Sequence, residues 1–187
     1  MGKRSDFERK PRDLYSTHPQ AVWPLHRQLM PLYGSPVCFV EPCAGEGDLI
    51  DHLVGRGHVL HDAWDINPDG HCKTKDCMNL TRDDVFPAEV IITNPPWPRP
   101  NSKGQPTLDI AMHLSSLLPT WLLLSADFAH NFYFSEIAER CAIIASVGRV
   151  SWEQNGISGK DNCAWYLFDQ KHWGPIVFVP KVREYAI

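Results

Sequence analysis

The sequence predicts an α/β fold in which a mainly parallel sheet carries helices on both faces. Two observations support this class. Short apolar runs typical of buried strands recur along the chain, and segments with helical periodicity lie between several of them. The length of 187 residues, of which 43% are hydrophobic and 21% charged, is ordinary for one globular domain. We therefore expect a single domain over residues 1–187, without internal repeats or linkers.

The elements are predicted in chain order from these patterns. An amphipathic helix is expected over residues 18–32, bounded or kinked by Pro24 and Pro31. Strands are expected at 37–41, 60–65, 90–93, 121–125, 142–147 and 163–168, with a short further strand near 71–75. Further helices are expected at 47–54, 107–118 and 130–140. Thr107 is a plausible N-cap and Pro119 a stop for the second of these.

Composition and charge exclude several classes of protein. The net charge of −4 does not fit a strongly basic nucleic-acid-binding domain. No apolar run approaches the roughly 18 residues of a membrane span, and the N-terminus lacks an apolar stretch for secretion. Residue 6 is Asp where a lipidation signal requires Ser or Thr. We expect a cytoplasmic protein without a membrane partner.

The six cysteines fit a reducing compartment and small buried side chains. His71, Cys72 and Cys77, with His58 or His61, are candidate ligands for zinc. Because the sequence has no Cys-x2-Cys pair, a surface loop with a helical turn is the better interpretation of this segment. No metal is expected.

The most informative run is Asn94-Pro95-Pro96-Trp97, which directly follows the apolar residues 90–92. It therefore begins where a buried strand ends, the edge at which open α/β sheets bind ligands. Two prolines stiffen the loop and remove two N–H donors, which leaves an acceptor-rich pocket beside an aromatic wall. Such a pocket suits a planar group that carries NH₂. Alternatively, the two prolines only end the strand.

A second pattern follows the first predicted strand. Glu41 ends this strand, and Gly45 and Gly47 allow a tight turn and close approach of a ligand to the backbone. Asp65 comes twenty residues after Gly45, at the end of the next strand, where an acid suits a ribose diol. Ile50 occupies the third glycine position of the dinucleotide pattern, which favours a nucleoside ligand without phosphates.

In these residues the chain resembles the S-adenosylmethionine-dependent amino-methyltransferases, most closely the DNA N6-adenine methyltransferases, over residues 13 to about 169. Residues 41–47 resemble the cofactor motif, Asp65 the ribose-binding acid, Asp76 the acid near the cofactor's adenine amine, and residues 94–97 the catalytic motif. Residues 13–19 resemble the N-terminal cofactor motif, although His18 is inserted between Thr17 and Pro19.

The resemblance implies a single Rossmann-like class I methyltransferase domain with a seven-stranded sheet, a C-terminal antiparallel hairpin and S-adenosyl-L-methionine as cofactor. The implied catalytic residues are Asn94, Pro95, Pro96 and Trp97. The implied cofactor-binding residues are Tyr15, Thr17, Glu41, Pro42, Cys43, Ala44, Gly45, Gly47, Asp65, Ile66, Asp76, Cys77 and Asn94.

Two polar loops, at 97–106 and 151–162, are expected to face the substrate, and residues 1–12 are expected to form a flexible basic arm. The first loop is interpreted as a lid, with an ordinary crossover as the alternative. Trp152 is either core or a wall of the target pocket. Residues expected to contact substrate are Trp97, Arg99, Lys103, Trp152, Ser158 and Lys160.

The expected function is transfer of a methyl group to the N6 amine of adenine in DNA, double- or single-stranded, with the base flipped into the pocket of Asn94 and Trp97. No recognition domain follows the last strand, so either the two loops or a partner would select the site. Alternatives are an RNA base amine, a protein glutamine amide, cytosine N4 (whose enzymes usually show Ser at position 94) and a non-catalytic cofactor-binding subunit. Oligomeric state stays open.

Overall fold

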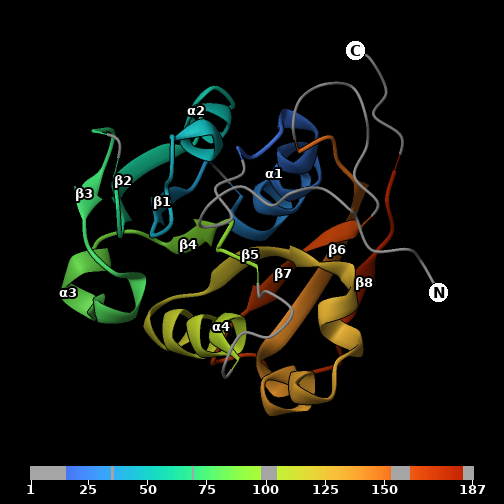
Figure 1. The fold of residues 1–187 in the computed structure, drawn as a ribbon. Coiled ribbons are helices and arrows are strands. Elements are labelled where there is room, and N and C mark those ends of the chain that lie inside the picture. The colour runs from blue at the N-terminus through green and yellow to red at the C-terminus, as the bar shows by residue number, and fades with distance from the viewer. Residues whose placement is uncertain (1–15, 35, 69, 98–104, 153–160, 183–187) are drawn as a thin grey trace.

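An eight-stranded sheet runs through the molecule and carries helices on both faces (Figure 1). The structure is a computed structural model that describes residues 16–34, 36–68, 70–97, 105–152 and 161–182. The strands are β1 (Cys38–Glu41), β2 (Val59–Asp65), β3 (Lys73–Thr74), β4 (Val90–Thr93), β5 (Thr120–Ser125), β6 (Cys141–Arg149), β7 (Asn162–Phe168) and β8 (Val177–Val179). The helices are α1 (Pro19–Tyr33), α2 (Asp48–Val54), α3 (Arg82–Val85) and α4 (Pro106–Leu117), with short 3-10 segments between them.

The strand order is β3-β2-β1-β4-β5-β7-β6-β8. Strands β1 to β5 are mutually parallel, whereas β7 is antiparallel to both of its neighbours, β5 and β6. This arrangement confirms the predicted mainly parallel sheet and its antiparallel hairpin. Because the chain moves from β1 outward in both directions, the carboxyl ends of β1 and β4 form the point where the strand order reverses.

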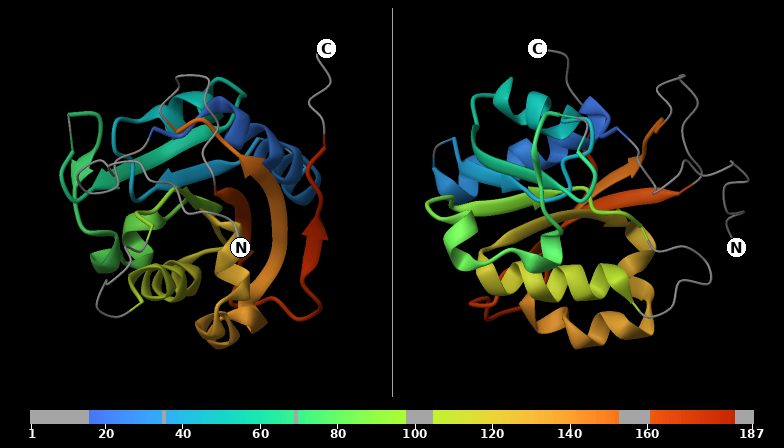
Figure 2. Two further views of the ribbon diagram at one scale, coloured as in Figure 1. Left: turned by 45° about the vertical axis from the view of Figure 1, so that its right-hand side comes forward. Right: turned by 60° about the vertical axis from the view of Figure 1, so that its left-hand side comes forward.

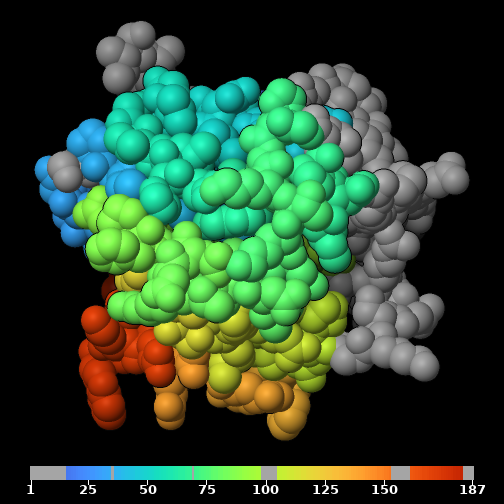
Figure 3. All heavy atoms as spheres, turned by 90° about the vertical axis from the view of Figure 1, so that its left-hand side faces the viewer, coloured from blue at the N-terminus to red at the C-terminus, as the bar shows by residue number. Residues whose placement is uncertain are grey.

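Alternate residues of the central strands face two separate cores. Phe39, Val90 and Trp121 face α1 and α2, and the residues that follow each of them, Val40, Ile91 and Leu122, face α4. Figure 2 shows the helices on either side of the curved sheet. Figure 3, which views the edge formed by β2 and β3, shows α2, the segment from β3 to α3, and α4 stacked from top to bottom. Burial of both faces explains why these strands are continuously apolar.

Helix α1 packs against the sheet, and it begins at the end of the sheet that carries the candidate functional site. His18 is its N-cap, and its Nδ1 accepts a hydrogen bond from the Gln20 amide at 3.2 Å. The helix continues through Pro24 and Pro31 and ends at Gly34, which adopts the left-handed conformation. The buried indole of Trp165 in β7 donates to the Ala21 carbonyl at 2.7 Å. This bond fixes the first turn of α1 to the sheet.

Two sequence predictions about the fold require correction. The sheet has eight strands and not seven, because residues 177–179 extend it beyond β6. Residues 176–179 are all apolar, but this run is short and lies between Pro175 and Pro180, and prolines argue against a strand.

The helix predicted at 130–140 is also wrong: three 3-10 segments span Ala126–His130, Phe132–Glu136 and Ala138–Arg140. The extended backbone of Asn131 separates the first two of these segments, and the buried residues Phe128, Phe134 and Ile137 do not follow a helical period. The short helix α3 was not predicted. Of the helices within the described residues, none has the length and apolar character needed to cross a membrane.

Candidate functional site

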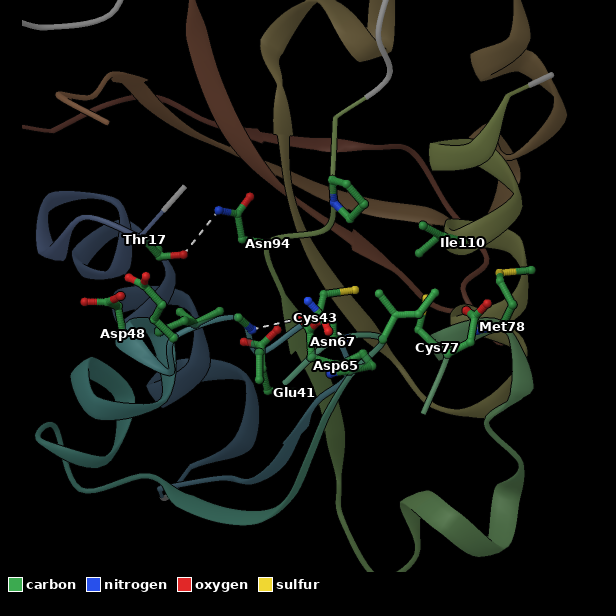
Figure 4. A pocket seen from close by; sticks show the side chains of 18 of the residues that line it. Thr17, Glu41, Cys43, Asp48, Asp65, Asn67, Cys77, Met78, Asn94 and Ile110 are labelled. Carbon is green, nitrogen blue, oxygen red and sulfur yellow. Dashed lines mark hydrogen bonds between the residues drawn. The ribbon is translucent and has the colours of Figure 1, made fainter. Parts of the chain in front are cut away.

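A pocket of about 390 Å³ opens at the carboxyl ends of β1, β2 and β4 (Figure 4). Its walls come from the end of β1 and the following turn, from the end of β2, from the 3-10 segment Cys77–Asn79, from the residues after β4 and from the start of α4. The volume lies within the range of about 300–1,000 Å³ found for small-molecule sites. The position is the switch point of the sheet, where open α/β folds bind ligands.

The turn after β1 and the acid after β2 hold each other in place. Gly45 and Gly47 have φ angles of 52° and 89°, in the left-handed region that favours glycine. The Asp65 carboxylate accepts hydrogen bonds from the amides of Gly45, at 2.9 Å, and Asn67, at 2.8 Å. Since a carboxylate offers about four acceptor sites, Asp65 keeps capacity for two hydroxyl donors at the pocket rim.

Glu41 is the buried charge of the site. Its side chain is 1% exposed and lines the pocket, and neither carboxylate oxygen has a hydrogen-bond partner of good geometry among the described residues. Burial raises the pKa of Glu41 to about 8, and the nearby Thr93 hydroxyl and Cys43 amide offset only part of this rise. A cationic ligand group in the pocket would satisfy this carboxylate.

The side of the pocket toward α4 combines an acid with two thiols. Asp76 caps the 3-10 segment Cys77–Asn79 by accepting from the Met78 amide at 2.9 Å. The thiols of Cys43 and Cys77 hydrogen-bond to each other, which together with burial raises the pKa of Cys43 well above its usual range. None of the six cysteines, all of which lie in the described part of the chain, forms a disulfide. The same hydrogen bond between the two thiols lowers the pKa of Cys77, so Cys43 is the thiol of the pair that holds its proton more firmly.

Asn94 brings the loop after β4 into the same pocket. Its side-chain nitrogen donates to the Thr17 hydroxyl at 3.2 Å, across 77 residues of sequence. In Figure 4 the amide nitrogen points at Thr17 and the amide oxygen points away from it. Pro95 is buried and Pro96 is exposed at the rim. The loop therefore presents a hydrogen-bond acceptor at the pocket.

Trp97 is held against the sheet next to this loop. Its indole N–H donates to the Leu123 carbonyl at 3.0 Å, and its ring meets that of Trp152 edge to face, with centroids 5.6 Å apart. Both rings are half-buried against the core under α1. Trp97 and Trp152 are not among the described residues that line the pocket, and their contact with a substrate base stays a prediction.

The structure brings most predicted cofactor residues together. The predicted residues that line the pocket are Thr17, Glu41, Pro42, Cys43, Ala44, Gly45, Asp65, Ile66, Asp76, Cys77, Asn94 and Pro96. Gly47 caps α2 directly behind the turn. Five predicted site residues lie outside the described part of the chain: Tyr15, Arg99, Lys103, Ser158 and Lys160.

Sequence reasoning missed part of the lining. The additional lining residues are Ser16, Glu46, Asp48, Leu49, Asn67, Met78, Pro106, Asp109 and Ile110. The first six lie within two residues of a predicted site residue, so proximity alone could have found them. The last three begin α4, and topology could have found them: a helix that follows a parallel strand starts at the carboxyl edge of the sheet.

Comparison with known proteins places the fold. No protein-family model and no curated protein matches the sequence. The solved structure of PH1948 from Pyrococcus horikoshii, a proposed RNA methyltransferase, is similar with a TM-score of 0.65 and 11% identity, over 89% of this chain and 92% of that one. A proposed class I S-adenosylmethionine-dependent methyltransferase from Listeria monocytogenes has a TM-score of 0.63 and 9% identity, over 89% of this chain and 65% of that one.

The fold is that of the class I methyltransferases. A third similar structure, protein 1320 of Thermoplasma acidophilum, has a TM-score of 0.56 and 13% identity, over 81% of this chain and 89% of that one. The pocket of Glu41, Asp65 and Asn94 lies at the carboxyl edge of a sheet that has this fold.

Proposed function

We propose that this protein transfers a methyl group from S-adenosyl-L-methionine to the N6 amine of adenine in DNA. The observation that carries the proposal is the position of Asn94, which lines the same pocket as Glu41 and Asp65. A cofactor pocket and an acceptor for an amine are thereby combined in one cavity. The class I methyltransferase fold of the chain supports the same reaction class.

The residues of the pocket fit the proposed cofactor at three points. The unpartnered Glu41 carboxylate would pair with the ammonium of its methionine part, and Asp65 would accept from its ribose hydroxyls. Asp76 would accept from its adenine amine, while Ile66, 67% exposed at the rim, offers apolar surface to the ring. When bound, the cofactor supplies a methyl group on a positively charged sulfur.

Asn94 and Pro95 would then activate the amine that is to be methylated. The lone pair of the adenine amine is delocalised into the ring, so this nitrogen is a weak nucleophile. Hydrogen bonds accepted from its NH₂ group by the Asn94 oxygen and the Pro95 carbonyl raise its electron density and orient it. Asn94 and Pro95 would hold the amine nitrogen in line with the methyl group that the bound cofactor would supply, and the methylated nitrogen would release its extra proton to solvent.

The target base would enter from the side on which Trp97 lies. In duplex DNA the base must leave the stack, at a cost of a few kcal/mol. Trp97 would stack on the base, an interaction worth roughly 1–3 kcal/mol in other nucleic-acid complexes. The bond from its indole to the Leu123 carbonyl fixes the ring before the base arrives, so little side-chain entropy is lost in stacking.

RNA is the second candidate substrate, for one specific reason. PH1948, whose structure is similar to 89% of the present chain, is described as a proposed RNA methyltransferase. An unpaired adenine or guanine amine of RNA presents the same NH₂ group to Asn94. The chemistry at the amine is unchanged, and only the groups that hold the polynucleotide differ.

A product analysis tests the proposal. The protein would be incubated with cofactor labelled in its methyl group and, separately, with duplex DNA, single-stranded DNA, RNA and a protein extract. Digestion and mass spectrometry then identify the methylated residue. We expect N6-methyladenine in DNA. Methylated RNA bases without DNA product would favour the second candidate, whereas methylglutamine, N4-methylcytosine or binding of cofactor without transfer to any substrate would overturn both.

A further inference from the structure

We propose that His26 and His58 form an acid-sensitive contact, which holds helix α1 in place only while both imidazoles are neutral. This histidine pair lies at the end of the sheet opposite to the pocket: His26 is in the middle of α1, and His58 directly precedes β2. The Nδ1 atom of His26 and the Nε2 atom of His58 are 2.9 Å apart, across 32 residues of sequence. The contact is independent of what the pocket binds.

A backbone contact decides the protonation state of His58. Its Nδ1 atom lies 3.1 Å from the amide nitrogen of Val37. Because a backbone N–H can only donate, this ring nitrogen must be the acceptor and carries no proton. The proton of the neutral ring is therefore on Nε2, the atom that faces His26. An imidazolium would carry protons on both nitrogens, and one of them would point at the amide proton of Val37.

The protonation state of His26 follows from that of His58. The Nε2–H group of His58 donates to Nδ1 of His26, so this nitrogen is unprotonated and the proton of the second ring is on Nε2. A further proton on Nδ1 of His26 would make two N–H groups face each other at 2.9 Å. Neither ring can therefore take up a proton while the chain of bonds from Val37 through His58 to His26 is intact.

The surroundings of the histidine pair do not compensate a positive charge. His58 is 2% exposed, and His26 is half-buried. On the side of α2, the charged group near both rings is Arg56, whose guanidinium donates to the His52 carbonyl at 2.9 Å. On the strand side, the Glu89 carboxylate accepts from the first amide of β1 and bonds to neither ring. Among the described residues, no carboxylate forms an ion pair with either histidine.

Burial acts in the same direction as the hydrogen bonds. Burial, and after it the charges of His26 and Arg56, lowers the pKa of His58 to about 4. The pKa of His26 is also lowered, by burial and by Arg56. The described residues offer the pair no third His, Cys, Asp or Glu side chain with which it could hold a metal ion. The neutral state of both rings is thus the one that the folded protein stabilises.

Acidification should loosen α1 because the histidine pair is one of its main polar attachments. Of the described residues in this helix, two form hydrogen bonds to other elements: the Ala21 carbonyl accepts from an indole of β7, and His26 accepts from His58. Ser16 and Thr17, which precede the helix, line the pocket. Protonation of either ring breaks the second attachment, so release of α1 becomes progressively more favourable below about pH 6.5. The histidine pair thereby couples pH to a wall of the pocket.

The first test compares urea denaturation of the wild type and His58→Asn from pH 7 to pH 5. The amide oxygen of the variant can accept from Val37 but cannot be protonated. Because Glu41 titrates in the same range in both proteins, the quantity to compare is the ratio of their unfolding equilibrium constants. This ratio, wild type over variant, should rise roughly 20-fold as pH falls from 7 to 5. His61→Gln, at an exposed position of β2, is the matched control and should follow the wild type. A ratio that does not change with pH would overturn the proposal.

Nitrogen NMR of the wild type tests the histidine pair without a variant that must fold. Both rings should be neutral at pH 7 and at pH 6, with the proton on Nε2. A proton on Nδ1 of His58, or an imidazolium at either position in the folded protein at pH 6, would refute the proposal.

Hydrogen exchange separates release of α1 from unfolding of the whole chain. As pH falls below 6.5, the amides of α1 should lose protection before those of β4 and β5 do, and His58→Asn should remove this difference. Equal loss of protection in the helix and the sheet of the wild type would show that the pair does not control α1, and the proposal would be wrong. None of these measurements requires methyl transfer, so they stand even if the proposed function fails.

Discussion

The proposed cofactor side of the site, with Asp65 and Asp76, and the proposed amine side, with Asn94 in the pocket and Trp97 next to it, are built in different ways. On the cofactor side, acids are held by backbone amides: Asp65 accepts from Gly45 and Asn67, and Asp76 accepts from Met78. On the amine side, the polar groups are held by parts of the chain that are distant in sequence. Asn94 bonds to Thr17, 77 residues away, and Trp97 bonds to the Leu123 carbonyl, 26 residues away.

This difference indicates how the two sides respond to change. The cofactor side is fixed by short turns that form together with β1 and β2, so a substitution there removes a ligand contact and affects affinity. The amine side is correct only when α1, β4 and β5 are docked in their final positions. A substitution there alters the geometry of the reacting group, which affects turnover more than binding.

The largest expected effect is that of Asn94→Ala. The variant removes the acceptor for the substrate amine, and we expect kcat to fall by about 10²-fold or more while cofactor affinity changes little. The measurements are single-turnover transfer from labelled cofactor and calorimetric titration with S-adenosylhomocysteine.

Asn94→Ser is the matched control, since its hydroxyl can accept from an amine but does not reach as far. Its kcat should lie between those of the wild type and Asn94→Ala. Wild-type turnover in Asn94→Ala would contradict the assignment of the amine side.

Asp65→Ala is expected to have the next largest effect, on the cofactor side. It removes a carboxylate that we expect to accept from the ribose and that also fixes Gly45. With about 1.5–3 kcal/mol for hydrogen bonds to a charged group, affinity for S-adenosylhomocysteine should fall roughly 10- to 100-fold. At saturating cofactor, kcat should stay close to that of the wild type.

Asp65→Asn keeps an acceptor for one of the two backbone amides and should bind with intermediate affinity. If a substitution of Asp65 lowered kcat but left the affinity for S-adenosylhomocysteine unchanged, the proposed difference between the two sides would be contradicted.

The pH dependence of cofactor binding comes third. Because the pKa of Glu41 is raised to about 8 without ligand, an ammonium can bind the ionised form only after this carboxyl releases its proton. Affinity should therefore rise as pH increases toward 8, by up to about tenfold per unit, and fall again above it, where the ligand's amine with a pKa of about 7.7–8.0 loses its own proton. Titrations in buffers of different ionisation enthalpy measure the released proton, and Glu41→Gln should abolish the release.

Ionisation of Glu41 also affects stability: the free energy of unfolding should fall with rising pH over the range in which cofactor affinity rises. A carboxyl whose pKa is raised on folding stabilises the protein below its unfolded pKa, near 4.3, and this contribution is lost as pH rises through about 8. Without cofactor, the free energy of unfolding should lose up to about 1.4 kcal/mol per pH unit from this residue within that window. In Glu41→Gln the loss should be absent, as urea denaturation at several pH values would show. Identical pH profiles in both proteins would contradict the raised pKa.

The same contrast explains what could be predicted from the sequence. Glu41, Gly45 and Asp65 were found because each stands at the end of a recognisable strand, and the spacing from Gly45 to Asp65 reports one turn, one helix and one strand. The pairing of Thr17 with Asn94 has no such signal. It depends on where α1 docks, and that is decided by contacts such as the Trp165 bond to Ala21, which no local pattern encodes.

Prediction of the strands and helices is limited in the same way, because local sequence patterns do not report tertiary packing. Strands buried on both faces, such as β4 with its apolar residues 90–92, were recognised. β8 was not, because its apolar run, residues 176–179, is short and lies between two prolines, which argue against a strand. At 126–140, aromatic residues are buried at spacings that a continuous helix would not produce, so tertiary packing overrode helical propensity.

The smallest expected effect belongs to Trp97→Phe. The ring keeps its aromatic face for a base and its edge-to-face contact with Trp152, but it loses the hydrogen bond to the Leu123 carbonyl. We expect a loss of about 1 kcal/mol in the free energy of unfolding and a two- to fivefold decrease in kcat/KM for the nucleic-acid substrate. Trp152→Phe is the matched control, because it alters the other ring of the same pair. It should affect stability alone if Trp97 is the ring that meets the base, and equal losses of kcat/KM in both variants would assign base contact to the pair as a whole.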